Sequence, residues 1–162
     1  CTGWKPGDDP KKRGIINSIY IDTETLAVHN DELQAMYKQV TANELMWEEY
    51  NCENAEYIIT AFGTVARIAK SAINELKEKG IHVGLVRPIT VWPFPYDAVA
   101  KAVNQPSVKA VLDVELNEGQ MLEDVKLAVC GTKPIDFTGH CGSQMPTTDE
   151  IVEKILSMKE GK

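Results

Sequence analysis

The fold class follows from residues 57–64, which read Tyr57-Ile58-Ile59-Thr60-Ala61-Phe62-Gly63-Thr64. The first six residues form a nearly continuous apolar run, which is typical of a strand buried on both faces of a sheet. The glycine and threonine that follow predict a turn. Apolar residues then recur at helical spacing over residues 65–79, and Gly80 is suited to end that helix. A buried strand followed by an amphipathic helix is the unit from which parallel α/β sheets are built.

The same alternation continues toward the carboxyl terminus. We expect further strands at 81–86, 108–116 and 135–137, and further helices at 95–103, 120–129 and after Thr147, where Glu150 completes a capping-box spacing. The sequence therefore predicts a three-layer, doubly wound α/β fold with a mainly parallel sheet of about five strands. The strands at 57–62, 81–86 and 108–116 should be central. The fifth strand is expected from residues 15–21 or 89–92.

The first fifty residues have a different pattern. Residues 5–13 are rich in proline, glycine and charge, which predicts an exposed loop. A helix is expected over residues 30–49, with Asn30 as its N-cap and an apolar stripe through Leu33, Met36 and Val40. That stripe is compatible with internal packing or with a partner. We therefore divide the chain into an interdomain segment, 1–50, with an arm and one helix, and an α/β domain, 51–162.

Composition excludes several classes of protein. The chain has 162 residues, 43% of them hydrophobic, and a net charge of -7, so nucleic acid and anionic membranes are not expected partners. No apolar run approaches the roughly 20 residues that span a bilayer. The four cysteines form no Cys-x-x-Cys pair, which favours a reducing cytoplasm and no metal site. Because the sequence opens on Cys1, we expect a fragment that begins inside a longer chain.

Ligands of parallel α/β sheets usually bind beyond the carboxyl ends of the strands. Gly63-Thr64 is compatible with a phosphate site at a helix N-terminus, or with an ordinary tight turn. Arg87 is compatible with binding an anion, although an internal ion pair with Asp113 or Glu115 is the favoured expectation.

The next loop, from Glu115 to Gln120, adds carboxylates to this edge. Asp113 and Glu115 share one face of a strand and are compatible with acid–base chemistry. The favoured alternative is that backbone N–H groups or Arg87 satisfy them. Neither a nucleophile nor a histidine is placed beside them by spacing, and the cysteines are expected to be structural. The residues alone thus offer no convincing catalytic set.

A proline-rich loop, 91–96, carries three aromatic side chains: Trp92, Phe94 and Tyr96. Prolines stiffen the backbone, and aromatic residues are common anchors of protein interfaces. We expect Trp92 and Phe94 to face a partner subunit, with packing onto their own sheet as the alternative.

Four stretches together resemble one family. They are residues 57–67, residues 84–95 with the string Arg87-Pro88-Ile89-Thr90-Val91-Trp92-Pro93-Phe94-Pro95, residues 114–121 and residues 146–151. They resemble the C-terminal part of the alpha subunit of 2-oxoacid:ferredoxin oxidoreductases, and the 2-oxoisovalerate (branched-chain) type most of all. The stretches at 17–20 and 29–30 also fit the interdomain region of that subunit.

The resemblance implies a transketolase C-terminal-like domain of an enzyme that uses thiamine diphosphate, Mg2+ and iron–sulfur clusters. Such enzymes convert a 2-oxoacid and coenzyme A to an acyl-CoA and CO2, and they reduce ferredoxin. No catalytic, cofactor or metal residue of the family maps onto this chain, so a structural role in assembly is expected. The implied partners are a preceding pyrimidine-binding domain and sister subunits, with ferredoxin and coenzyme A reached only through the complex.

Two other classes of function stay open. One is a free-standing α/β domain that binds a nucleotide or small anion at Gly63-Thr64. The other is a pure interaction module.

Overall fold

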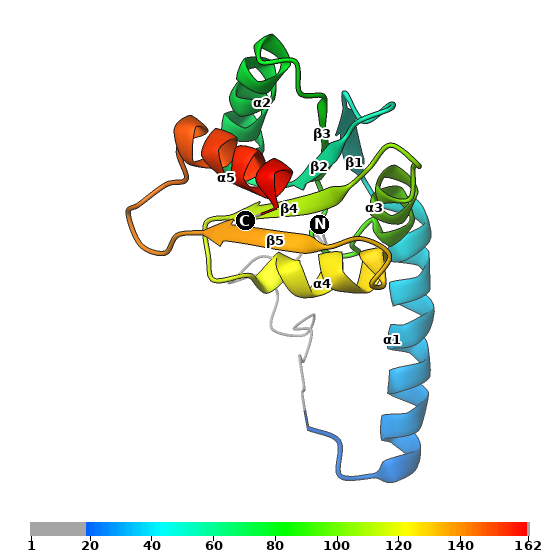
Figure 1. Ribbon diagram of the computed structural model, residues 1–162. Helices are drawn as coiled ribbons and strands as arrows, with labels where there is room; N and C mark the ends of the chain where they lie inside the picture. Colours follow the sequence, from blue (N-terminus) through cyan, green and yellow to red (C-terminus); the bar gives the residue numbers. More distant parts are fainter. Residues whose placement is uncertain (1–18, 162) are drawn as a thin grey trace. The chain divides into compact units, whose positions relative to one another are not determined.

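The computed structural model describes residues 19–161 (Figure 1). The chain divides into two compact units, residues 1–39 and residues 40–162, and each is described by itself. Most of the first described stretch is helix α1, Thr23–Asn43, in which no residue is buried.

Helix α1 corrects the expectation of a helix over residues 30–49. It begins seven residues earlier, because Asp22 rather than Asn30 supplies the first acceptor: Oδ2 of Asp22 accepts the Thr25 N–H at 2.8 Å. It also ends earlier, at Asn43. Residues 47–50, which were expected to close the helix, form a strand instead.

The second unit holds a five-stranded sheet in the order β1-β3-β2-β4-β5. Strands β2 (Tyr57–Thr60), β3 (Val83–Pro88), β4 (Ala110–Glu115) and β5 (Ile135–Gly139) are parallel to one another. The prediction of a mainly parallel sheet with three central parallel strands is therefore confirmed.

The fifth strand is β1, Trp47–Tyr50, which pairs antiparallel with β3 at the edge of the sheet. Residues 19–21 and 89–92 form no strand, so those expectations are wrong over these residues. Residues 15–18 lie outside the described part of the chain. A four-residue edge strand carries little signal of its own, because its hydrogen bonds come from partner residues 35 to 41 positions away in the sequence.

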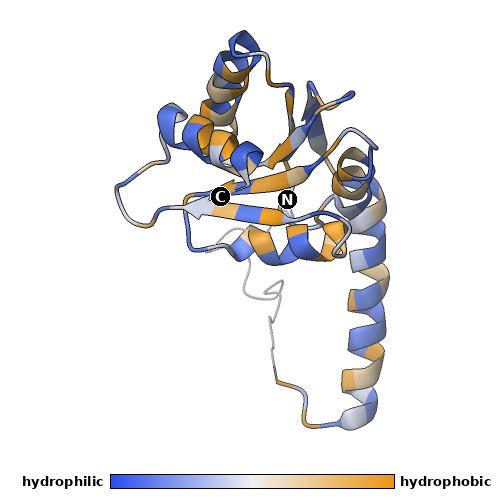
Figure 2. Ribbon diagram, in the orientation of Figure 1, coloured by the Kyte–Doolittle hydropathy of each residue, from blue (hydrophilic) through white to orange (hydrophobic). Residues whose placement is uncertain are grey.

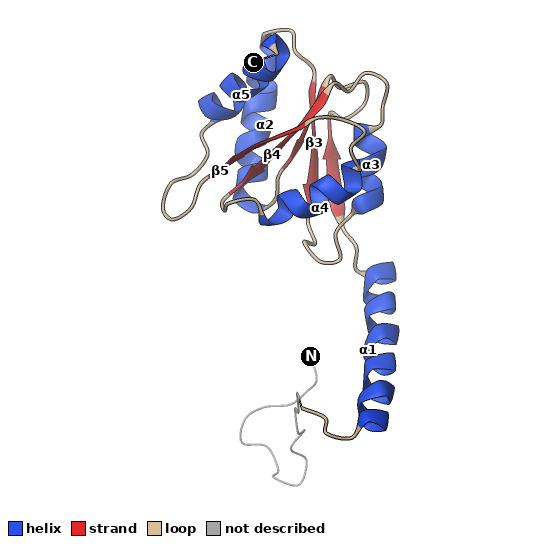
Figure 3. Cartoon of the chain, turned by 60° about the horizontal axis from the view of Figure 1, so that its bottom comes forward, coloured by secondary structure: helices blue, strands red, loops and turns tan. Residues whose placement is uncertain are grey.

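Helices cover both faces of the sheet (Figure 3). Helices α2 (Gly63–Glu78) and α5 (Thr148–Glu160) pack together on one face, and α3 (Tyr96–Val103) and α4 (Gln120–Val129) pack together on the other. This is the predicted three-layer arrangement. Helix α5 begins with the predicted capping box, in which Thr147 Oγ1 accepts the Glu150 N–H and the Thr147 N–H donates to the Glu150 carboxylate.

Alternate side chains of the central strands pack into two separate hydrophobic cores, one on each face of the sheet. Ile59 of β2 and Leu85 of β3 face α2 and α5, whereas their neighbours Ile58 and Val86 face α3 and α4. Figure 2 shows the consequence, with apolar strands between helices that are apolar on one side only. At Gly84 the chain has no room for a side chain, since an added Cβ would lie 2.7 Å from Cα of Cys52. Burial on both faces gives the sheet most of its stability, at about 25 cal/mol per Å² of apolar surface.

Candidate functional site

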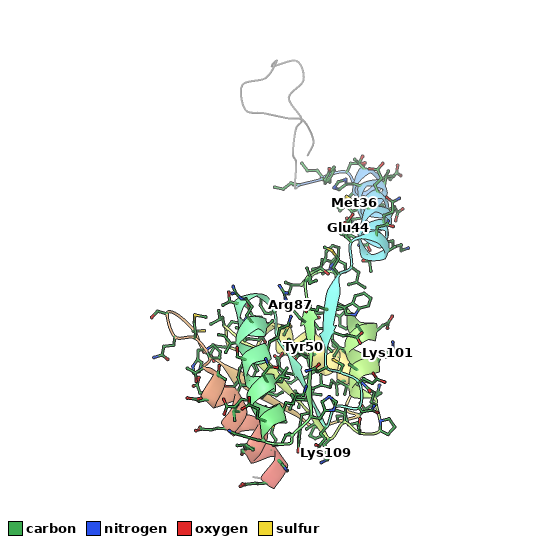
Figure 4. All side chains as sticks on the ribbon, turned by 90° about the horizontal axis from the view of Figure 1, so that it is seen from above. Met36, Glu44, Tyr50, Arg87, Lys101 and Lys109 are labelled. Atoms are coloured by element: carbon green, nitrogen blue, oxygen red, sulfur yellow. The ribbon has the colours of Figure 1, made fainter. Side chains whose placement is uncertain are left out.

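The carboxyl edge of the sheet brings together most of the residues that the sequence singled out. Because β2, β3 and β4 are parallel, the residues that end or follow them, Gly63, Arg87 and Glu115, lie at one edge. In Figure 4, Arg87 is at this edge and Lys109, just before β4, is at the opposite one. Trp92 and Phe94 lie in the loop that leaves the same edge after β3.

Glu115 is fully buried and binds the start of helix α4. Its Oε2 accepts the Met121 N–H and its Oε1 accepts the Leu122 N–H, each at 2.9 Å, while the Asn117 side-chain amide donates to Oε2 at 2.9 Å. The expectation that backbone N–H groups satisfy this carboxylate is confirmed. A carboxylate of the chain itself thus occupies the helix N-terminus where an external anion would bind.

Asn117 and Gln120 complete the turn that presents this helix. Oδ1 of Asn117 accepts the N–H groups of Gly119 and Gln120, each at 2.8 Å. Gly119 has a φ of 98°, a left-handed conformation that favours glycine. Gln120 itself is exposed at the first position of α4. The turn therefore serves to seat α4 on Glu115.

Asp113 lies two residues before Glu115 on the same face of β4, and it is also fully buried. Its Oδ1 accepts the Thr60 hydroxyl at 2.6 Å, and its Oδ2 has no hydrogen-bond partner when the group is a carboxylate. Burial first, and then the neighbouring Glu115, raise the pKa of Asp113 to about 8. As a neutral acid Asp113 has a proton to share with Glu115, so the two groups form a carboxylic acid–carboxylate pair inside the domain.

Arg87 does not join this pair, which corrects the expected ion pair with Asp113 or Glu115. Its Nη1 donates to Oε2 of Glu48 at 3.1 Å, and Lys70 of α2 binds the other oxygen of Glu48. Two facts of the sheet explain the difference. Strand β2 lies between β3 and β4, and Arg87 alternates with Val86 so that it faces α2, whereas Asp113 faces α3 and α4.

Gly63 and Thr64 begin helix α2. Gly63 has a φ of 58°, and an added Cβ there would meet no atom within 4 Å, so the glycine serves the backbone turn rather than a close approach. The residue before it, Phe62, gives no side-chain cap, and the first turn of α2 contains no acid. Gly63 and Thr64 are both exposed. The binding of an anion at this start of α2 stays a prediction.

Trp92 and Phe94, which the sequence treated as a pair, have different environments. Phe94 is 5% exposed and belongs to the core beneath α3 and α4, where its ring meets the Tyr96 ring edge-on at 5.0 Å between centroids. Trp92 is 61% exposed. Phe94 therefore folds back on its own sheet, and only Trp92 is available to a partner.

Two cysteines and one histidine, Cys141, Cys52 and His140, show no sign of activated chemistry. Glu118 hydrogen-bonds Cys141 and holds the pKa of that thiol above its usual range, and burial raises the pKa of Cys52 to about 11. His140 Nε2 lies 3.0 Å from Oε1 of Glu150. Within residues 19–161, no group of three His, Cys, Asp or Glu residues is arranged to hold a metal ion.

Sequence reasoning missed the contacts that join β1 to the loop after β3. The N–H groups of Ile89 and Thr90 both donate to the Met46 carbonyl, at 3.0 and 3.1 Å, and the Met46 N–H donates to Thr90 Oγ1 at 3.0 Å. The sequence offered one signal for these contacts. Thr90 lies beside a proline-rich loop, and a threonine hydroxyl in such a place favours hydrogen bonds to nearby backbone groups. No helix in the described part of the chain is long and apolar enough to cross a membrane.

Solved structures define the class of fold. The chain is similar to a 2-oxoglutarate:ferredoxin oxidoreductase from Magnetococcus marinus with a TM-score of 0.73 and 18% identity, over 94% of this chain and 27% of that one. It is also similar to a split-gene transketolase with a TM-score of 0.54 and 16% identity, over 65% of this chain and 38% of that one. The second unit is therefore a transketolase C-terminal-like α/β domain.

Sequence comparison identifies the family within that class. The sequence model of pyruvate:ferredoxin oxidoreductase core domain II matches residues 55–151. A ketoisovalerate oxidoreductase subunit, VorB of Methanothermobacter marburgensis, is 34% identical over 155 residues, which are 95% of this chain and 43% of that subunit. The chain belongs to the 2-oxoacid:ferredoxin oxidoreductase family, as the core domain II type. It spans less than half the length of this relative.

Proposed function

We propose that this chain is a non-catalytic structural and assembly domain of a thiamine-diphosphate-dependent 2-oxoacid:ferredoxin oxidoreductase. The complete enzyme would convert a 2-oxoacid and coenzyme A to an acyl-CoA and CO2 and pass the electrons to ferredoxin. The observation that carries this proposal is the similarity to VorB over 95% of the chain. The same relative favours 2-oxoisovalerate as the substrate of the complete enzyme.

The residues of the carboxyl edge support a structural role. Two fully buried acids, Asp113 and Glu115, occupy the centre of this edge, and Glu115 already binds the N–H groups at the start of α4. A diphosphate would find the N–H groups at the start of α4 already bound to Glu115, and both acids are buried, out of reach of its Mg2+. The chain also has no Gly-Asp-Gly stretch of the kind that binds thiamine diphosphate. The donor set does not fit the cofactor, and we derive no catalytic step from this chain.

The role would instead be to brace the pyrimidine-binding domain of the same subunit and to contact sister subunits. Iron–sulfur clusters, coenzyme A and ferredoxin would be bound elsewhere in the complex. At this edge Glu115 binds the start of α4 and Arg87 binds Glu48, so both charged groups are held within the domain, which suits bracing because these groups need no ligand to hold their positions.

The test is to produce the complete subunit with its sister subunits under anaerobic conditions. We expect coenzyme A-dependent reduction of ferredoxin, with the highest kcat/KM for 2-oxoisovalerate among 2-oxoisovalerate, pyruvate and 2-oxoglutarate. A preference for another 2-oxoacid would overturn the substrate assignment alone. An assembled complex that oxidises no 2-oxoacid would overturn the proposed function.

A second candidate function rests on the uncapped start of α2. An anion at Gly63-Thr64 would make this chain a small-anion or nucleotide-binding domain. Titrating the labelled chain with inorganic phosphate and with ATP separates the two candidates by NMR. Saturable shifts of the Gly63 and Thr64 amides favour this second function, and unchanged spectra remove it.

A further inference from the structure

Five large apolar side chains are exposed on two segments of the second unit that lie next to one another. Exposed fractions are 49% for Met46, 42% for Trp47, 49% for Ile89, 46% for Val91 and 61% for Trp92. We call these five residues the docking patch. Trp47 opens β1, and the other segment follows β3 directly, so the patch lies at the carboxyl edge beside the antiparallel edge strand.

The backbone beneath the docking patch is fixed. The Met46 carbonyl accepts the N–H groups of both Ile89 and Thr90, and Thr90 Oγ1 accepts the Met46 N–H. The Thr90 hydroxyl in turn lies 3.0 Å from the Pro93 carbonyl, which ties the second half of the loop to the first. A surface that is already ordered loses little conformational entropy on binding, so its apolar area is available for association.

The patch differs from the other exposed apolar residues of the described chain. Leu127 on α4 and Met145 near the carboxyl terminus are also exposed, but no other large apolar side chain within ten positions of either one in the sequence is exposed. Single exposed apolar residues are ordinary on protein surfaces, whereas a contiguous group marks an interaction site. Two of the five are tryptophans, the residue most enriched among the energetic centres of interfaces.

The margin of the docking patch is acidic. Glu44 is exposed two residues before Met46, and Glu49 accepts the Trp47 indole N–H at 3.2 Å. On the other side, the hydroxyl of Tyr96 donates to Asp124. Arg87, two residues before Ile89, is bound to Glu48. A second copy of this chain would therefore place carboxylates against carboxylates, and nucleic acid or an anionic bilayer would be repelled.

We propose that the docking patch binds a folded protein surface with an apolar centre and a rim of Lys and Arg residues. This partner surface belongs to another part of the same oxidoreductase, so the proposal rests on the proposed function. The tryptophans enter the apolar centre of the partner. The carboxylates of Glu44 and Glu49 face the cationic rim and set the orientation of the two surfaces.

Hydroxyl-radical footprinting of the complete enzyme tests burial of the patch. Oxidation of Met46, Trp47 and Trp92 is measured by mass spectrometry in the assembled enzyme and in this chain alone. We expect the three side chains to lose most of their reactivity on assembly. Equal oxidation in the two samples overturns the proposal. Protection already present in the isolated chain, together with concentration-dependent dimerisation, overturns it in favour of a second copy.

A charge reversal tests the nature of the rim. In the double variant Glu44→Lys with Glu49→Lys, the fraction of enzyme in which no partner covers the docking patch should rise about tenfold. This fraction is measured as oxidation of Trp92. Glu78→Lys, at an exposed position at the far end of α2, is the matched control and should leave Trp92 oxidation unchanged. Protection that survives the double reversal shows that the partner rim is not cationic and overturns that part of the proposal.

Activity of the same preparations separates this proposal from the proposed function. A preparation that reduces ferredoxin with a 2-oxoacid while the patch stays reactive refutes docking and leaves the function standing. A preparation that assembles and protects the patch, yet oxidises no 2-oxoacid, refutes the function and leaves the docking surface standing.

Discussion

The Thr60 hydroxyl donates a 2.6 Å hydrogen bond to Oδ1 of Asp113, and neither residue is exposed to solvent. This bond joins the last residue of β2 to β4, and the two strands are paired at these positions. Glu115 lies two residues further along β4, and burial together with this neighbouring acid raises the pKa of Asp113 to about 8. The neutral acid is therefore the favoured form of Asp113 in the folded domain below about pH 8.

Replacing Asp113 by asparagine should flatten the pH dependence of stability. The pKa of Asp113 is about 8 in the folded chain against 3.8 for the ordinary side chain, so folding takes up a proton between these values. The free energy of unfolding of the parent chain therefore carries a component that falls as pH rises from about 4 to about 8. Asparagine removes that component, because its amide donates toward Glu115 at any pH and its oxygen still accepts from Thr60. Urea denaturation at pH 5 and pH 8 measures the effect.

The control for this experiment is Asp136→Asn, which changes an acid that is partly exposed on β5. The free energy of unfolding of Asp136→Asn should vary with pH much as that of the parent does, whereas that of Asp113→Asn should vary less. If Asp113→Asn unfolds with the same pH dependence as the parent, Asp113 is ionised in the folded protein and the acid–carboxylate pair does not exist.

Truncating Glu115 should destabilise the domain strongly. Glu115→Ala leaves the buried N–H of Met121 and the N–H of Leu122 without their acceptor, and charged hydrogen bonds of this kind contribute roughly 1.5–3 kcal/mol each. Glu115→Gln keeps an oxygen for one of the two donors and should lose less. Chemical denaturation ranks the variants, and an alanine variant as stable as the parent would show that α4 does not depend on this carboxylate.

A double-mutant cycle should find Arg87 coupled to Glu48 and not to Asp113. The pair is about one-third exposed on each side, so the expected coupling between Glu48→Gln and Arg87→Met is roughly 0.2–1 kcal/mol. The corresponding cycle with Asp113→Asn should give none, because the two side chains face opposite sides of the sheet. Coupling of Arg87 to Asp113 above that to Glu48 would contradict the structure.

Replacement by alanine should cost much more stability at Phe94 than at Trp92. Phe94→Ala removes a buried ring and should cost about 3–5 kcal/mol in the free energy of unfolding. Trp92→Ala changes an exposed side chain and should cost under about 1 kcal/mol in this chain. Urea unfolding of the single variants decides the point. Equal losses at the two positions would mean that Trp92 is as much a core residue as Phe94.

This chain alone should not bind thiamine diphosphate. The start of α4 is already bound to Glu115, and the neighbouring Asp113 would add repulsion as soon as it ionised. Calorimetric titration with thiamine diphosphate and Mg2+ should give only heats of dilution. Saturable micromolar binding would refute the assignment of the cofactor to other parts of the enzyme.

The sequence predicted elements whose signals are local. The capping box of Thr147 and Glu150 located the start of α5, and the apolar run that opens at Tyr57 located a central strand. Glu115 was expected to bind backbone N–H groups or Arg87, and the structure shows the first of these two alternatives. These features depend on residues only a few positions apart.

Features that depend on distant pairing were missed. Trp47 lies seven residues after Val40, so residues 47–49 were expected to continue the helix, but the hydrogen bonds of Trp47–Tyr50 to β3 outweigh that local preference. The partner of Arg87 could not be read from spacing, because β2 separates β3 from β4 only after the sheet is assembled. The exposure of Trp92 and the burial of Phe94 likewise follow from the path of the loop, which no local pattern specifies.

The strand order also sets a sequence of events during synthesis of the chain. The ribosome releases β1 before the other four strands of this sheet, yet β1 has no partner in the sheet until β3 has emerged and paired with β2. Strands β4 and β5 are then added on the opposite side of β2, one after the other. The nascent sheet thus grows outward from its second strand in both directions, and residues 47–50, although made early, wait with an unpaired backbone. A chaperone or a neighbouring nascent domain has its opportunity to act on β1 in that interval.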